Sequence, residues 1–214
     1  MKKGKRILAL VMMMVLAISL CGCGDTSKKL YGTWETTLDY ASVLEEELGS
    51  GYEDFHEPFE LKLMVEFKED GTYSMYADEE YAIETVDQWV QALAAYDTEV
   101  AYNEYEGSGM SREEVDEAFQ QQFGCSLEEY VLEAYQDTFD VDELVSEMYT
   151  EGVYQAKGNK LYMDEVEVSP DTYDIFTVEG DTLTIDIPEG AEVDEDEMIE
   201  GIDYPLTFTK VAAE

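Results

Sequence analysis

Hydrophobic residues occupy every second position from 59 to 67, with mainly charged residues between them, which predicts a β-strand with one buried face and one wet face. A second run, rich in β-branched and aromatic residues, covers 72–77. Asp70-Gly71 lies between the two runs, and this pair favours a hairpin because it accepts the positive φ angles of such turns. Over the whole chain we expect eight strands. They cover residues 30–38, 59–67, 72–77, 153–156, 160–164, 172–178, 182–187 and 204–211.

Between about residues 80 and 150 the hydrophobic period changes from two to about 3.6, which predicts a block of helices. A shorter helix is expected after Asp39, closed by Gly49. Three helix starts in the block pair an N-cap residue with a glutamate three positions later. They are Ser111 with Glu114, Ser126 with Glu129, and Asp140 with Glu143. Because strands flank the block on both sides, we interpret residues 30–212 as one β domain with a helical insertion at about 80–150.

Residues 1–22 resemble a secretory signal peptide, since a basic start is followed by an apolar run over residues 7–20. The run is shorter than the roughly 20 residues of a membrane-spanning helix. It ends in Leu20-Cys21-Gly22-Cys23, which resembles the lipobox of bacterial lipoproteins. The resemblance implies a mature chain that starts at a diacylglycerol-modified Cys23 and continues as a tether over 23–29. The alternatives are lipidation of Cys21, which places bulky Leu20 before the cleavage site, and an ordinary secretory peptide.

The chain carries 52 acidic and 12 basic side chains, a net charge of −40, and loss of residues 1–22 would change it to −44. This charge excludes nucleic acid as a partner. It also repels anionic lipid headgroups, so we expect acyl chains to hold the protein on the extracytoplasmic face of the cell membrane. Cys125 is the only other cysteine of the mature chain, so no intramolecular disulfide is expected once Cys23 is acylated.

Leu30-Tyr31-Gly32-Thr33-Trp34 on the first predicted strand resembles the Gly-x-Trp signature of lipocalins and of lipocalin-like (calycin-type) domains in bacterial lipoproteins. Residues 67–73 and 206–211 agree with this resemblance, although no Thr-Asp-Tyr signature occurs in the second half. The family fold is an eight-stranded antiparallel up-and-down barrel, which holds one small apolar ligand or is filled by its own side chains.

The resemblance also implies structural roles for three residues of the barrel. Trp34 would close one end of the barrel beneath a cation from the last strand. That cation is Lys210 here, where lipocalins commonly have Arg. Gly32, Trp34 and Lys210 are therefore expected to support the fold rather than to contact a ligand.

No residue pattern indicates a catalytic centre, and we expect neither an enzyme nor a bound metal or cofactor. Acids occupy about one position in four, so neighbouring carboxylates carry little information about glycosidase chemistry. His56 is the only histidine, and we interpret it as an ordinary loop residue because zinc and Ser-His-Asp sites need further partners. The acidic run 194–197 lacks the spacing and the glycine of a calcium loop.

Two features of the helical block leave alternatives open. Cys125 precedes a helix start, and we interpret it as a small buried hydrophobe that packs against Tyr130. The alternative is a thiol made reactive by a helix N-terminus. Tyrosines are frequent in the block and favour either a protein interface or the edge of a helical core. They are Tyr81, Tyr96, Tyr102, Tyr105, Tyr130, Tyr135 and Tyr149.

Two functions from different classes follow from these observations. The first is a membrane-anchored, non-enzymatic binding module that holds a small hydrophobic ligand in its barrel. The alternative is an envelope protein-interaction or structural lipoprotein with a solid barrel, whose acidic helical block docks a basic protein. A hydrolase would depend on carboxylates alone.

Overall fold

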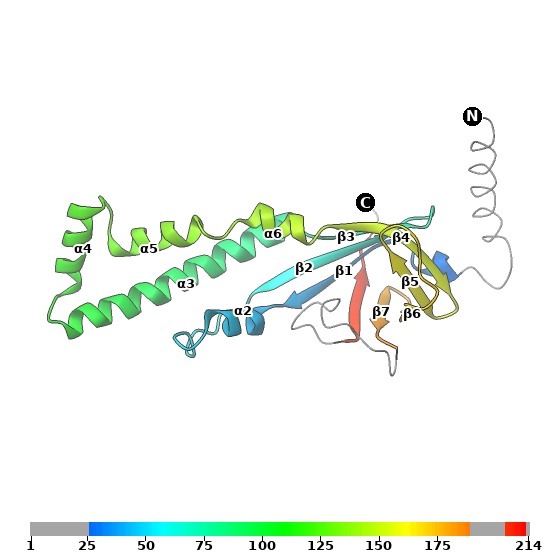
Figure 1. The fold of residues 1–214 in the computed structure, drawn as a ribbon, viewed down its shortest axis with the longest axis horizontal. Helices are drawn as coiled ribbons and strands as arrows, with labels where there is room; N and C mark the ends of the chain where they lie inside the picture. Colours follow the sequence, from blue (N-terminus) through cyan, green and yellow to red (C-terminus); the bar gives the residue numbers. More distant parts are fainter. Residues whose placement is uncertain (1–25, 189–203, 213–214) are drawn as a thin grey trace, which may run out of the picture.

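The computed structural model describes residues 26–188 and 204–212, which form an elongated molecule with a β-barrel at one end and a helical arm at the other (Figure 1). Eight antiparallel strands pair in sequence order, and β8 pairs with β1 to close the barrel. The predicted fold class is confirmed, and the barrel is compatible with a lipocalin-like fold. The strands are β1 (Gly32–Asp39), β2 (Glu60–Phe67), β3 (Thr72–Ala77), β4 (Thr150–Lys157), β5 (Lys160–Asp164), β6 (Asp174–Glu179), β7 (Thr182–Asp186) and β8 (Leu206–Lys210).

Hydrophobic side chains fill the barrel interior. Leu63, Val65 and Phe67 of β2 point inward and are buried, as the alternation of this segment predicts. They belong to one cluster with buried residues from the rest of the barrel. These are Leu30, Trp34, Leu38, Tyr73, Tyr154, Leu161, Phe176, Leu183, Ile185, Leu206 and Phe208.

Consecutive strands run in opposite directions, so alternate connections lie at the same end of the barrel. The short β2–β3, β4–β5 and β6–β7 turns lie at one end with the amino-terminal 3-10 helix η1 (Thr26–Lys29), and we call this the η1 end. Gly71 in the first of these turns has a φ of 87°, the positive value expected for the Asp-Gly pair. The longer β1–β2, β3–β4 and β5–β6 connections leave from the opposite end, which we call the arm end.

The arm connects β3 to β4 through α3 (Glu79–Gly107), α4 (Arg112–Gln122), α5 (Leu127–Gln136) and α6 (Val141–Glu147). Its 29-residue helix α3 extends about 43 Å at 1.5 Å per residue, α4 forms the tip, and α5 returns beside α3 (Figure 1). Capping boxes are present at Ser111 and Ser126. The third predicted cap, Asp140, accepts a hydrogen bond from the Glu143 backbone N–H.

A second hydrophobic core joins the arm to the barrel. Trp89 of α3 lies at its centre, with ring centroids 5.8 Å from Phe55, 5.6 Å from Phe59 and 5.4 Å from Phe139. Helix α2 (Ala41–Leu48), α5 and α6 pack around this core. Leu61 of β2 belongs to it as well, so β2 contributes to both cores.

Several sequence predictions fall outside the described residues, including the signal peptide, Cys23 and the acidic run 194–197. The proposed domain limits therefore stay a prediction. Within residues 26–188 and 204–212, no helix combines the length and the apolar character that crossing a membrane requires.

Candidate functional site

Gly32, Trp34 and Lys210 meet at the η1 end, where the first and last strands pair. Trp34 is fully buried, and its Nε1 donates a hydrogen bond to the Leu30 carbonyl at 2.6 Å. Lys210 Nζ lies 4.9 Å from the centroid of the indole ring, within cation–π range. Gly32 has a φ of 112°, and a Cβ there would lie 3.2 Å from Lys210 Cε, so a larger residue would be both strained and crowded. These contacts close the barrel.

Three polar groups lie at the arm end of the barrel, where β1 ends and β6 and β8 begin. They are the side chains of Tyr40, Asp174 and Tyr204. Burial raises the pKa of Asp174 to about 6. Burial also raises the pKa of Tyr204, and the negative charge of Asp174 raises it further. The pKa of Tyr40 is raised by burial and then by Tyr204. The barrel therefore has a polar arm end above an apolar interior.

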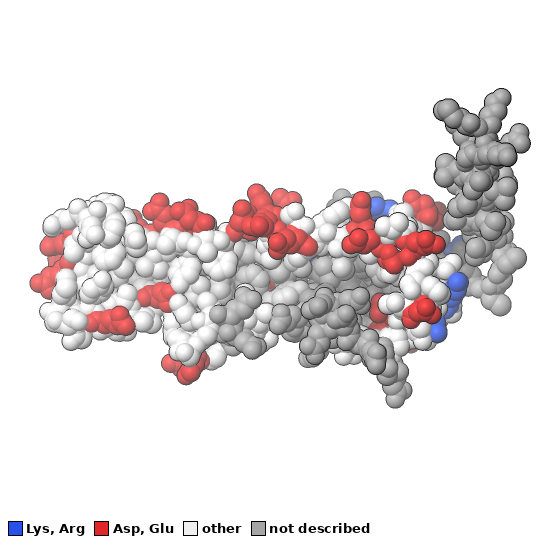
Figure 2. Space-filling model, in the orientation of Figure 1, with Lys and Arg blue, Asp and Glu red and all other residues white. Residues whose placement is uncertain are grey.

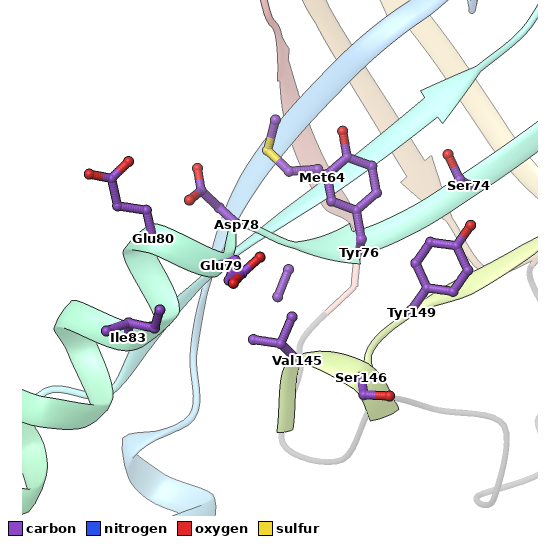
Figure 3. Close-up of a pocket in the computed structure, with 11 residues that line it drawn as sticks. Met64, Ser74, Tyr76, Asp78, Glu79, Glu80, Ile83, Val145, Ser146 and Tyr149 are labelled. Carbon is purple, nitrogen blue, oxygen red and sulfur yellow. The ribbon is translucent and has the colours of Figure 1, made fainter. Parts of the chain in front are cut away.

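A pocket of about 940 Å³ lies outside the barrel, at the root of the arm (Figure 3). Met64 and Tyr76 belong to the outer faces of β2 and β3, because they alternate with inward residues such as Val65. Ile83 of α3 and Tyr149, which follows α6, come from the arm. The complete lining is Met64, Ser74, Tyr76, Ala77, Asp78, Glu79, Glu80, Ile83, Val145, Ser146 and Tyr149.

The pocket combines an apolar surface with an acidic rim. Ile83 is 46% exposed and Tyr149 52% exposed, so both leave apolar surface open at the pocket. Asp78 is already engaged, since it caps α3 through the Tyr81 N–H at 3.0 Å and its carboxylate lies 3.8 Å from Lys62 Nζ. Glu79 and Glu80 are exposed in the first turn of α3. The pocket suits a ligand that has both an apolar part and a positive charge.

The arm carries little positive charge of its own. Residues 79–147 include 20 acidic residues and one cation, Arg112. The Arg112 guanidinium is bound by Glu99, at 2.7 and 2.9 Å, and by Glu106, at 3.1 Å. None of the helices α3 to α6 has a basic residue in its last turn, so the negative ends of their dipoles are uncompensated. Acidic side chains extend along the arm in Figure 2.

An aromatic cluster lies at the tip of the arm. The ring centroids of Phe119, Phe123 and Tyr130 are 4.7 to 5.6 Å apart, and Phe123 and Tyr130 are 46% and 42% exposed. Cys125, between α4 and α5, is partly exposed. The interpretation of Cys125 as a fully buried hydrophobe is therefore wrong. Tyr130, its expected partner, packs with the two phenylalanines.

The tyrosines of the arm divide between structural and exposed positions. Tyr102 Oη donates to Asp116 at 2.7 Å, and burial, with this carboxylate, raises the pKa of Tyr102 to about 12. Tyr135 Oη donates to Asp97, and burial is the main cause that raises its pKa. Tyr105, Tyr130 and Tyr149 are exposed. The interpretation as the edge of a helical core thus describes Tyr102 and Tyr135, and the interface interpretation stays a prediction for the exposed tyrosines.

Among the described residues, His56 is the remaining sequence candidate, since the run 194–197 lies outside them. His56 is exposed in the β1–β2 connection. Among the residues that the structure describes, no three His, Cys, Asp or Glu side chains are grouped so that they could hold a metal ion. No protein-family model, curated protein or solved structure matches this chain.

The pocket at the root of the arm was not predicted from the sequence. Its lining comes from β2, β3, α3 and the end of α6, which lie far apart in the sequence. One signal was available: Met64 is an apolar residue on the otherwise charged outer face of β2, between Lys62 and Glu66.

Proposed function

We propose that this protein is a lipid-anchored extracytoplasmic protein-interaction module, in which a solid lipocalin-like barrel supports an arm that binds a basic polypeptide. The observation that carries the proposal is the pocket at the root of the arm. Its apolar lining is rimmed by Glu79 and Glu80, and the pocket continues into an arm with 20 acidic residues and one cation. A peptide with apolar and cationic side chains would be complementary to both features.

The packing of the barrel supports the role of a scaffold. A hydrophobic ligand inside the barrel would need room, but buried side chains such as Trp34, Tyr154 and Phe208 form one cluster there. A second candidate function keeps a small apolar ligand and places it in the pocket outside the barrel, between Met64, Ile83 and Tyr149. The volume of about 940 Å³ favours this candidate.

The proposal involves no catalytic step. Asp174, whose pKa burial raises to about 6, is a group of the kind that an acid catalyst needs. It lies at the start of β6, near Tyr204, and does not line the pocket. Its environment is that of a carboxyl group at the edge of a folded core.

The lipid anchor is part of the same proposal and has a test of its own. Acylation at Cys23 follows from the lipobox resemblance, so Cys23→Ser should release the protein from the membrane fraction. Unchanged retention of this variant in the membrane would contradict the anchor. The extracytoplasmic location depends on the same leader.

A peptide-binding experiment tests the site. The probe is a synthetic amphipathic peptide of leucine and lysine, with a control peptide that has glutamine in place of lysine. We expect the soluble Cys23→Ser chain to bind the lysine peptide at least tenfold more tightly than the control, with an affinity that falls as salt is added. Ile83→Lys places a positive charge at the pocket and should abolish this preference.

Val100→Lys is the matched control for Ile83→Lys. Val100 lies on the same helix, is 41% exposed and does not line the pocket. Val100→Lys should change the affinity for the lysine peptide by less than about threefold. Equal effects of the two substitutions, or equal binding of the two peptides, would overturn the proposed site. A small apolar molecule that co-purifies and is lost in Ile83→Lys would favour the second candidate function.

A further inference from the structure

The cations of this acidic chain are concentrated at the η1 end of the barrel. The described residues include eight Lys and Arg, and six of them belong to η1, to the β2–β3 and β4–β5 turns and to the end of β8. The six are Lys28, Lys29, Lys68, Lys157, Lys160 and Lys210. On the face drawn in Figure 2, the visible cationic side chains lie over the barrel and not over the arm.

The acidic residues are distributed in the opposite way. Five acids belong to the same turns and strand ends as the six cations, namely Glu66, Glu69, Asp70, Glu179 and Asp181. Asp164 and Glu165 also lie near Tyr73, at the start of β3, so this part of the barrel is close to neutral. The rest of the described chain has 35 acidic residues and only two cations, Lys62 and Arg112. An anionic surface would therefore repel the arm but not the η1 end.

The predicted anchor joins the molecule at the same end. Three peptide units separate Cys23 from Thr26, the first residue of η1, which limits their distance to about 11 Å. Acyl chains on Cys23 would enter the bilayer, so this short tether would hold η1 close to the headgroups. The tip of the arm lies at the other end of the long axis (Figure 1).

Two of these lysines contact tyrosines of β5 and of the segment that precedes β6. Lys160 Nζ lies 3.7 Å from the ring centroid of Tyr173, and Lys157 Nζ lies 5.6 Å from that of Tyr162. The two tyrosine rings are 5.6 Å apart. Lysine and tyrosine both combine an apolar body with a polar tip, and such side chains are typical of the membrane–water interface.

We propose that the η1 end of the barrel rests on the headgroups of an anionic phospholipid bilayer and that the arm consequently points away from the membrane. This inference depends on the proposed lipid anchor. It differs from the expectation, drawn from net charge alone, that the whole protein is repelled by anionic lipid. The excess negative charge lies mainly on the arm. An anionic membrane would therefore repel the arm but not the η1 end, and this difference would orient the molecule.

Energy transfer from a single label to acceptor-labelled headgroups tests the orientation. The experiment uses the full lipidated chain with Cys125→Ser, and the label is attached at Asn159→Cys in the β4–β5 turn or at Gln121→Cys in α4. On vesicles of phosphatidylglycerol and phosphatidylcholine, we expect strong transfer from position 159 and weak transfer from position 121. Equal transfer, or stronger transfer from position 121, would overturn the inference.

Two charge-matched double variants test the role of the lysines. Lys29→Glu with Lys157→Glu removes cations from the η1 end, and Lys62→Glu with Arg112→Glu makes the same change in net charge elsewhere. The first pair should reduce transfer from position 159 by about half on vesicles with phosphatidylglycerol, but not on pure phosphatidylcholine. The second pair should leave it unchanged. Equal effects of the two pairs would refute a specific anionic contact.

Mass spectrometry of the amino-terminal peptide separates the two proposals. Acylated Cys23 together with equal transfer from both labels would refute the orientation and leave the anchor standing. Unacylated Cys23 would refute the anchor and, with it, this membrane-facing surface.

Discussion

The barrel and the arm bury hydrophobic surface in different ways. In the barrel, side chains from eight strands meet in one closed core around Trp34. In the outer arm, the buried cluster contains only Tyr102, Val115 and Leu127, and the helices carry excess negative charge. A region with few buried contacts and unbalanced charge opens more readily than a closed core. We therefore expect the barrel to set the global stability of the protein and the arm to adapt to a partner.

The unfolding of the barrel and the unfolding of the arm can be followed separately. The chain has two tryptophans, Trp34 in the barrel core and Trp89 in the root core. Each is buried, so each can report on its own region when the other is replaced. One pair of substitutions can thus test whether the barrel and the arm differ in stability.

The largest effect is expected for Trp34→Ala. The substitution removes a fully buried ring, its hydrogen bond to Leu30 and its contact with Lys210, and it should lower the free energy of unfolding by about 4 kcal/mol. Chemical denaturation followed by the circular dichroism of the sheet measures this. Trp89 fluorescence should report unfolding of the arm in the same transition. A variant whose barrel unfolds at the same denaturant concentration as the parent protein would contradict the central role of Trp34.

Trp89→Ala should affect the arm more than the barrel. The substitution removes the ring that Phe55, Phe59 and Phe139 contact edge-on, at a cost of about 3 kcal/mol to the root core. Hydrogen exchange should become faster in α3, α5 and α6, while the strands keep their protection and Trp34 keeps its buried fluorescence. Equal acceleration in the arm and the strands would show that the two regions form one cooperative unit.

The sequence predicted both regions well where local signals decide the structure. Eight strands and the caps at Ser111, Ser126 and Asp140 follow from side-chain periodicity and from hydrogen bonds between close neighbours. The length of α3 was not predicted. Its apolar stripe was recognised over residues 86–93, but the helix continues to Gly107, where tertiary contacts with α4 and α5 stabilise a mostly polar segment.

The candidate sites depend on long-range proximity and could not be predicted in the same way. Cys125 is partly exposed, and sequence position beside a helix start did not reveal this. The pocket requires Met64, Ile83 and Tyr149 to meet, and they belong to separate elements. The lysines of the η1 end come from segments that lie far apart in the sequence. The packing of the arm against β2 and β3 forms the pocket, and the closure of the barrel brings the lysines together.

A smaller effect, in the barrel alone, is expected for Asp174→Asn. Burial raises the pKa of Asp174 to about 6, so the native state binds this proton more tightly than the unfolded chain does. The protonated carboxyl group therefore stabilises the native state at low pH, and this stabilisation is lost as the pH rises through about 6. Asparagine cannot ionise. Between pH 4 and pH 8 the free energy of unfolding of the variant should therefore rise by about 1 to 2 kcal/mol relative to that of the parent protein.

Chemical denaturation of both proteins at pH 4, 6 and 8 measures this difference. The pH dependence is the informative quantity, because the buried amide adds an offset that does not change with pH. A difference that stays constant over this range would show that Asp174 titrates alike in the folded and unfolded states.

The smallest effect is expected for a substitution of Thr98 in the arm. Thr98 of α3 is buried, and its Oγ1 has no hydrogen-bond partner among the residues that the structure describes. A buried hydroxyl without a partner destabilises the native state, so the nearly isosteric Thr98→Val should stabilise the arm by about 1 kcal/mol. Thr98→Ser keeps the hydroxyl and loses a methyl group, so it should destabilise the arm instead. Hydrogen exchange at α3 and α5 measures both changes, and a destabilising valine would mean that the Thr98 hydroxyl has a partner in solution, such as a bound water.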